Sequence, residues 1–259
     1  MTTAIQLSDR PAIEYPDSDG LPMADNTLQF RWISTIMWGL DALFLHDPQV
    51  FVAGDLLWYP VEGEPTIRIS PDVMVAFGRP RGDRGSYKQW EEGGLPPQVV
   101  FEVLSPGNRP GEMERKLQFY EKYGVEEYYL YDPDHGGLDG WRRSGNLLEQ
   151  IPDMAGFVSP RLGIRFEPGK GTDNLRIFGP DGTRFLTFTE WVEKSKANDR
   201  RAEAERQRAE AERQRADAAE LRAEEQTRFA LAESLRADEE RQRAERLAAR
   251  LRDLGNEPE

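Results

Sequence analysis

The chain has 259 residues, of which 34 are basic and 47 acidic, and its formal net charge of −13 disfavours the strong, generic DNA affinity that a basic surface provides. The absence of cysteine excludes disulfides and thiolate metal sites. Since the sequence shows neither a secretory signal nor an apolar stretch of the ~20 residues that span a membrane, we expect a cytoplasmic protein with no membrane partner.

The sequence divides into three parts. Residues 1–23 are polar and interrupted by prolines, which indicates an extended leader. Residues 24–195 are sufficient for one well-filled core and form the predicted domain. Residues 196–259 form a charged tail, which from Asp199 onward holds 14 Arg and 17 acidic residues but no Lys. A segment of this composition cannot form a second globular core.

The first predicted elements of the domain are a helix and two β segments. One of the polar residues at 25–27 can cap the helix, whose apolar residues recur near the helical period at Leu28, Trp32, Ile36, Leu40 and Leu43. A strand follows from Val50, and residues 66–77 form a β-rich run. Residues 79–97 are long for a loop, which is typical of functional or mobile segments. Their basic residues could form a local DNA-binding patch, namely Arg79, Arg81, Arg84 and Lys88.

The second half of the domain begins with a strand over residues 98–104. This segment is almost continuously apolar, which predicts burial on both faces. We expect a helix over 111–123, stopped by Gly124, and then a strand over 127–131. Strand, helix and strand in this order imply a right-handed parallel crossover and hence an α/β fold. Antiparallel hairpins are expected from there up to Phe166.

The C-terminal part repeats with a period of seven residues. The sequence AEAERQR occurs over 202–208 and again over 209–215, and alanine stands at every seventh position from 202 to 244. This pattern predicts a long helix, which follows one that begins at about Thr187. Its seam is mostly Ala and Gln, so an exposed charged helix is the main interpretation. A weak coiled coil through residues 199–254, with a second copy or another protein, is the alternative.

Two acidic residues interrupt segments that are otherwise apolar. Asp72 stands at the mouth of one predicted strand, and Glu102 lies within another. An ionised carboxylate is costly to bury without a cation, and two carboxylates with waters and a backbone carbonyl, such as that of Val103, suit Mg²⁺. Lys116, on the following helix, could add a positive charge that stabilises a phosphodiester in reaction, or could help to deprotonate the attacking water.

Each of these residues also has an interpretation in which it has no catalytic or metal-binding role. An Asp after Pro commonly forms a turn, a strand Glu can face solvent at a sheet edge, and a lone Lys is more often a surface residue. Asp55 is a possible extra metal ligand, although its strand position can equally face solvent. His46 and His135 are expected in turns and receive no catalytic role.

An ordered string of short motifs resembles the Uma-two family of restriction endonucleases in the PD-(D/E)XK nuclease superfamily, which is abundant in cyanobacteria. The matching residues are Pro71-Asp72, Pro97 to Pro106, Lys116-Leu117, Tyr120, Gly124-Val125, Glu127-Tyr128 and Tyr131 to Pro133. The resemblance spans residues 26–166, and the charged tail is similar to an appendage of cyanobacterial relatives. It implies a mixed sheet flanked by helices, a restriction-endonuclease-like core, with Mg²⁺ or Mn²⁺ bound between the strands that carry Asp72 and Glu102.

The chain departs from the family pattern at the lysine. A standard site has Lys two residues after the strand acid, where this sequence has Leu104, and the resemblance implies that Lys116 replaces it. Glu112 stands where many relatives have Asp. The first helix offers Gln29 and Asp41 but no Glu, so no helix-borne third acid is assigned.

Two functions follow from these observations. The first is a Mg²⁺-dependent endonuclease that hydrolyses DNA by metal-activated water, with Asp72 and Glu102 as metal ligands and Lys116 stabilising the reacting phosphate. The alternative is a catalytically weak or inactive nuclease-fold protein that binds partners or acts as a scaffold through its tail. The acidic body and the displaced lysine favour this alternative. No motif identifies a recognised base sequence.

Overall fold

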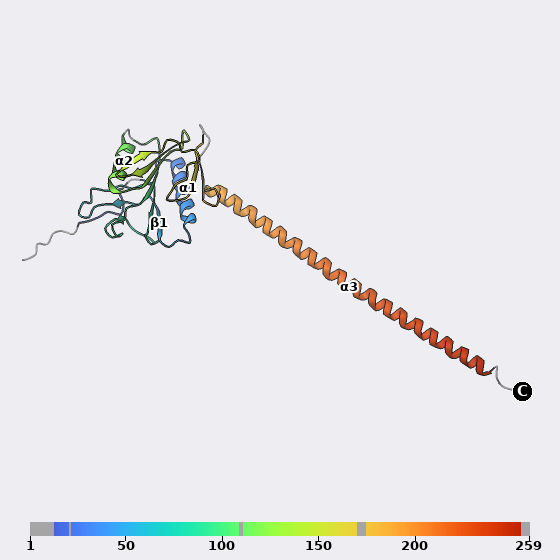
Figure 1. Cartoon of the computed structure of the whole chain (residues 1–259). Helices are drawn as coiled ribbons and strands as arrows, with labels where there is room; N and C mark the ends of the chain where they lie inside the picture. The colour runs from blue at the N-terminus through green and yellow to red at the C-terminus, as the bar shows by residue number, and fades with distance from the viewer. Residues whose placement is uncertain (1–12, 21, 109–110, 170–174, 255–259) are drawn as a thin grey trace, which may run out of the picture. The chain divides into compact units, whose positions relative to one another are not determined.

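The computed structural model of the chain describes four stretches, residues 13–20, 22–108, 111–169 and 175–254 (Figure 1). The chain forms two compact units, which divide after Trp191. In its described part, the first unit holds a six-stranded sheet, two further pairs of short strands and the helices α1 and α2. Residues 1–12 and Leu21 of the predicted leader lie outside the described residues.

The central sheet has the strand order β1-β3-β5-β6-β7-β8. Its strands are β1 (Val50–Gly54), β3 (Val73–Phe77), β5 (Val99–Val103), β6 (Glu127–Asp132), β7 (Gly137–Ser144) and β8 (Leu147–Gln150). Within this sheet β5 and β6 are parallel, joined through α2 (Glu112–Tyr123), and every other neighbouring pair is antiparallel. The predicted mixed sheet flanked by helices is confirmed, and so is the parallel pairing of the strands on either side of α2.

Two hydrophobic cores lie on the two faces of this sheet, one on the side of α1 and the other on the side of α2; the two helices are labelled in Figure 1. Since side chains alternate along a strand, Val73 and Val75 join the core of α1 (Thr27–Leu43), and Met74 and Ala76 join the core that contains Tyr120 of α2. The α1 side also holds β9 (Arg165–Glu167) and β10 (Arg176–Phe178). The α2 side holds β2 (Trp58–Tyr59) and β4 (Tyr87–Lys88). All five residues of β5 are buried, as its apolar sequence predicts.

Local sequence signals explain where the helices begin and end. The side chain of Asn26 caps α1 by accepting the backbone N–H of Gln29 at 2.8 Å. Gly124 ends α2 with a left-handed φ of 97°, which glycine adopts without steric cost. At the start of α3 (Phe188–Leu254), Thr187 and Glu190 form a reciprocal capping box.

The chain from Val50 differs from the single strand that the sequence predicts. It divides into β1 and β2 at Asp55, which has a left-handed φ of 48°. The N–H of Asp55 donates to the carbonyl oxygen of Asp72 at 3.2 Å, so the break is fixed by a contact distant in sequence. Both predicted hairpins are found: β7 pairs with β8, and the second hairpin is a short one with an antiparallel bridge between Val158 and Arg165. β9 pairs in addition with the later strand β10.

The segment over residues 79–97 is held by its own contacts. It contributes β4, and Arg84 forms an ion pair with Glu92 at 2.6 Å. Its other basic residues also have acidic neighbours within ion-pair distance, since Arg79 lies near Glu92, Arg81 near Asp41 and Lys88 near Glu91. These pairs neutralise the predicted basic patch. The described part of the leader packs nearby, with the Tyr15 ring centroid 4.9 Å from that of Trp90.

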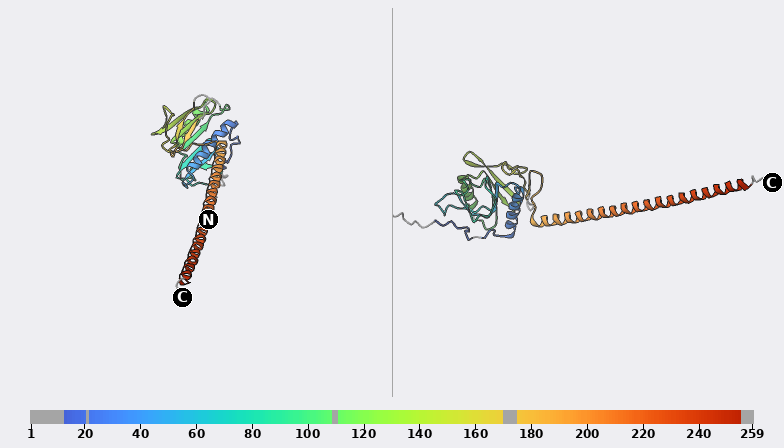
Figure 2. Two further views of the ribbon diagram at one scale, coloured as in Figure 1. Left: turned by 90° about the vertical axis from the view of Figure 1, so that its right-hand side faces the viewer. Right: turned by 90° about the horizontal axis from the view of Figure 1, so that it is seen from below.

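The helix α3 runs unbroken for 67 residues, and from Val192 onward it belongs to the second unit (Figure 2). From residue 196 to residue 250 every side chain is exposed. The predicted long charged helix is confirmed, and its pairing as a coiled coil stays a prediction. In the described chain, no helix combines the length and apolar character needed to cross a membrane.

Candidate active site

Asp72 and Glu102 lie opposite each other on neighbouring strands. β3 is antiparallel to β5 with Val73 opposite Phe101, so one further step of the same register places Asp72 opposite Glu102. Directly opposite residues of an antiparallel pair project to the same face of the sheet. The structure therefore brings the two predicted acids together on the face that α2 covers.

The carboxylate of Glu102 is buried and has a partner on each oxygen. The side-chain amine of Lys116 donates to Oε2 at 2.7 Å, and the hydroxyl of Tyr120 donates to Oε1. Glu102 is only 2% exposed. Lys116 and Tyr120 are four residues apart on α2 and so project from the same side of the helix. One helix therefore supplies both donors to this carboxylate.

Asp72 is buried beside Glu102, but fewer hydrogen-bond donors offset the burial of its carboxylate. Its Oδ2 accepts the backbone N–H of Val103 at 2.7 Å, and no described residue donates to its Oδ1. Burial and the nearby charge of Glu102 raise the pKa of Asp72 well above its usual value, against the opposing effects of Lys116 and the Val103 N–H. A cation beside Asp72 would relieve this unfavourable environment.

Lys116 keeps its positive charge in the site. Burial opposes that charge, but the carboxylates of Glu102 and Asp72 outweigh burial and raise the pKa of Lys116 above its usual value. A lysine with a raised pKa is a poor proton acceptor near neutral pH. Of the two roles that the sequence left open, a raised pKa suits electrostatic stabilisation better than deprotonation of water.

The other predicted ligands each have a hydrogen-bond partner. The carbonyl oxygen of Val103 accepts the side-chain amide of Gln29 at 2.8 Å, which uses one of its two lone pairs. Asp55 accepts the hydroxyl of Ser70 at 2.9 Å. Across the described residues, no three His, Cys, Asp or Glu side chains are arranged to hold one metal ion, so Asp55 does not complete a three-acid group.

The donor set that the structure assembles has two carboxylates, and this set fits Mg²⁺. Mg²⁺ commonly binds through one or two carboxylates, retains several waters and takes its remaining ligands from a phosphate substrate. The unused oxygen of Asp72 and the Oε2 of Glu102, where the lysine ammonium now sits, are hard oxygen donors of the kind this ion prefers. The residues present thus suit a single divalent cation.

Two participants in this site were not predicted from the sequence. Tyr120 reads as an ordinary apolar position of its helix, yet its hydroxyl bonds Glu102. Its spacing of four residues from Lys116 is the signal that could have found it. Gln29 stands out in the sequence only because the first helix has no Glu. No sequence signal indicates its hydrogen bond to the carbonyl oxygen of Val103.

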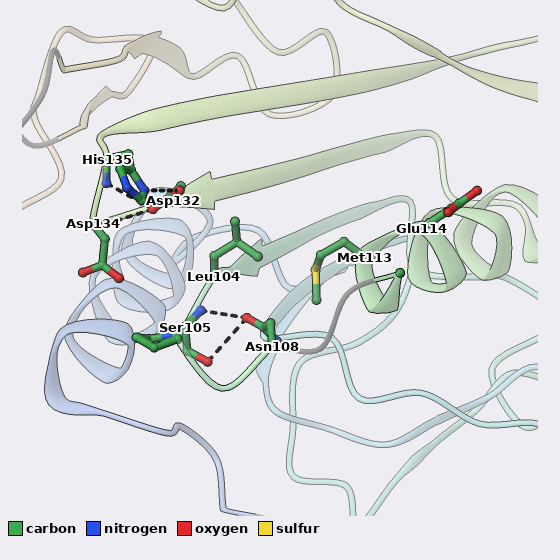
Figure 3. Close-up of a pocket in the computed structure, with 10 residues that line it drawn as sticks. Leu104, Ser105, Asn108, Met113, Glu114, Asp132, Asp134 and His135 are labelled. Atoms are coloured by element: carbon green, nitrogen blue, oxygen red, sulfur yellow. Dashed lines mark hydrogen bonds and ion pairs between the residues drawn. The ribbon is translucent and has the colours of Figure 1, made fainter.

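A separate pocket of about 610 Å³ lies where β5 and β6 end and α2 begins (Figure 3). It is lined by residues of three segments, among them Leu104, Ser105, Asn108, Met113, Asp132 and His135. His135 lies in the expected turn, and its Nδ1 is 2.8 Å from Asp132 Oδ2. Asp72, Glu102 and Lys116 do not line this pocket, so the reactive groups are elsewhere.

The mixed sheet and its carboxylate–lysine cluster have the arrangement that a nuclease resemblance implies, and comparison with known proteins agrees. Residues 6–167, more than half of the chain, match the family Uma2, described as "Putative restriction endonuclease". The chain belongs to this family.

Two further comparisons add nothing to the assignment of the family. A crystal structure described as a putative nuclease belonging to DUF820 from Anabaena variabilis is similar over 53% of this chain and 75% of that chain, with 15% identity and a TM-score of 0.41. No curated protein matches the chain.

Replacing Asp72 with asparagine is expected to raise the free energy of unfolding at pH 8. An acid whose pKa is raised by folding binds its proton more tightly in the folded state. Its contribution to stability therefore falls as pH rises from the unfolded pKa of about 4 through the higher folded pKa. Urea unfolding at pH 4 and pH 8, without divalent ions, should show the difference only at pH 8. The exposed Asp83→Asn variant is the control. If the Asp72→Asn variant is less stable than wild type at pH 8, the buried charge of Asp72 does not destabilise the fold.

Proposed function

We propose that this protein is a metal-dependent endonuclease that hydrolyses phosphodiester bonds of DNA. The observation that carries the proposal is the buried Asp72 beside Glu102 and a protonated Lys116, a cluster that is costly unless it serves a cation or an anionic substrate. Membership of a family described as restriction endonucleases supports DNA as the substrate.

Asp72 and Glu102 are the residues that would hold the ion, which we propose to be Mg²⁺ with Mn²⁺ as a substitute. Such an ion supplies Lewis acidity at the phosphate and makes water a stronger acid. The residues before Asp199 include 20 basic and 30 acidic side chains. Neutralising the two buried acids also lowers the repulsion that this body would exert on a phosphate backbone.

Lys116 would supply a positive charge beside the acid pair. Its amine lies 2.7 Å from Glu102 Oε2 in an ion pair that is largely shielded from solvent, and its flexible stem would let the amine turn toward a bound phosphate. A positive charge in such a site stabilises the negative charge that develops on a reacting phosphate. Because its pKa is raised, Lys116 provides this charge over the whole neutral range.

Replacing Lys116 with glutamine is expected to slow plasmid nicking in Mg²⁺ or Mn²⁺ by about 100-fold. This is the typical loss of rate when one group that stabilises the charge of the transition state is removed. The amide can still donate to Glu102, so the site remains bonded while the charge is lost. The assay follows the conversion of supercoiled plasmid to nicked circles, and circular dichroism confirms folding.

The matched control is Lys122→Gln, on the last turn of the same helix, where the amine lies 5.0 Å from the Tyr123 ring centroid. It should cut at the wild-type rate. Equal rates in wild type and Lys116→Gln would remove Lys116 from the mechanism, and the absence of any metal-dependent cutting by wild type would argue against the endonuclease itself.

A further inference from the structure

The two oxygens of Glu102 have partners of different character. Oε2 accepts the amine of Lys116, a flexible side chain that remains 18% exposed. Oε1 accepts the hydroxyl of Tyr120, whose side chain is fully buried. A lysine can withdraw along its four-carbon stem, whereas a buried ring cannot. Oε2 is therefore the oxygen that can be released to a metal ion.

Aromatic packing fixes the position of the Tyr120 ring. Its centroid lies 6.5 Å from that of Trp58, with the planes nearly parallel at 4°, and 5.2 Å from that of Tyr128. The hydroxyl of tyrosine ordinarily ionises only at about pH 10, so it is protonated and can donate to Oε1 near neutral pH. The bond to Oε1 is thus present throughout the physiological pH range.

We propose that Tyr120 is a positioning residue that limits Glu102 to one-oxygen metal binding and so favours Mg²⁺ and Mn²⁺ over Ca²⁺. This inference rests on the proposed function, because it concerns the ion that the acid pair would hold. Two-oxygen binding requires both carboxylate oxygens to turn toward the ion. The Tyr120 hydroxyl occupies one lone pair of Oε1 and fixes the direction of this oxygen, so turning Oε1 toward the ion would strain or break the bond to a buried donor, which is unfavourable.

The preference for Mg²⁺ follows from the coordination habits of the ions. Ca²⁺ takes six to eight oxygen ligands in flexible geometry and often binds a carboxylate through both oxygens. Mg²⁺ requires a near-octahedral arrangement, in which it usually binds one oxygen of each carboxylate and retains several waters. A glutamate with one oxygen permanently bonded to a tyrosine therefore suits the smaller ion.

The test is Tyr120→Phe, which removes the hydroxyl and keeps the ring. Calorimetric titrations of the full chain with Mg²⁺, Mn²⁺ and Ca²⁺ should show that the ratio of Mg²⁺ to Ca²⁺ affinity falls by about 10-fold, a typical effect of losing a bond to a metal ligand. Tyr128→Phe is the matched control. It is a buried tyrosine in the same core whose hydroxyl lies 3.9 Å from Met113 Sδ instead of on Glu102. Its affinity ratio should equal that of wild type.

The possible outcomes separate this inference from the proposed function. If wild type binds neither Mg²⁺ nor Mn²⁺, both are overturned. If wild type binds Mg²⁺ and Tyr120→Phe keeps the wild-type ratio, or Tyr128→Phe shifts it equally, the role of Tyr120 alone is overturned. Infrared spectra of wild type provide a measurement that needs no variant. The carboxylate stretching bands should show one-oxygen coordination with Mg²⁺, and two-oxygen coordination would contradict the proposal.

Discussion

Replacing Glu102 with glutamine is expected to reduce the rate of Mg²⁺-dependent DNA cleavage by about 1000-fold, the upper end of the loss for a single electrostatic contact in a water-poor site. The substitution preserves side-chain size, and the amide oxygen can still accept the Tyr120 hydroxyl. It removes the negative charge that would bind the ion and that also orients Lys116. Single-turnover cleavage of a labelled duplex at saturating Mg²⁺ measures the chemical step.

The effect should be specific to the buried carboxylate. Glu149→Gln, an exposed glutamate on β8, makes the same chemical change outside the site and should cut at the wild-type rate. A Glu102→Gln protein that folds normally and cuts within tenfold of wild type would show that this residue does not hold the ion. Cleavage would then have to depend on groups other than the acid pair.

Replacing Glu127 with alanine is expected to destabilise the protein by about 3 kcal/mol, because it leaves several buried donors unpaired. Glu127 is 1% exposed and accepts the Tyr129 hydroxyl at 2.9 Å, the Ser159 hydroxyl and the Arg161 backbone N–H at 2.9 Å. It thereby ties β6 to the chain over residues 159–161. Urea unfolding at pH 7 measures the loss.

The neighbouring Glu126 provides a close comparison. Its carboxylate pairs with the Arg161 side chain at a partly exposed position, so Glu126→Ala should cost no more than about 1 kcal/mol. Equal losses in the two variants would contradict the bonding assigned to Glu127. Glu127 and Glu102 are both buried acids, but only Glu102 lies beside a second carboxylate, so below its melting temperature Glu127→Ala should retain cleavage.

The apolar pattern of the sequence predicted the central part of the fold because burial of β5 and β6 depends on local composition. The parallel pairing followed from the order of strand, helix and strand. The break at Asp55 could not be predicted, since a left-handed residue other than glycine is maintained there by a bond to the distant Asp72 carbonyl. The pairing of β9 with β10 likewise depends on a segment further along the chain.

The site was predicted as three residues and proved to involve more. Asp72, Glu102 and Lys116 stood out because charge is unexpected beside apolar strands. Tyr120 carried no such signal, since a tyrosine on a helix facing a core usually only packs. Charge alone also misled, because the three arginines of the 79–97 segment are ion-paired with Glu92 or Asp41, whose proximity no spacing rule reveals.

The two donors to Glu102 come from successive turns of α2, and this makes the length of the connection between β5 and that helix critical for assembly of the site. A shift of α2 by one residue rotates each side chain by about 100° around the helix axis. Neither Lys116 nor Tyr120 would then reach the carboxylate. Insertions or deletions over residues 104–111 should therefore be tolerated far less than changes of length in the surface turn between β7 and β8.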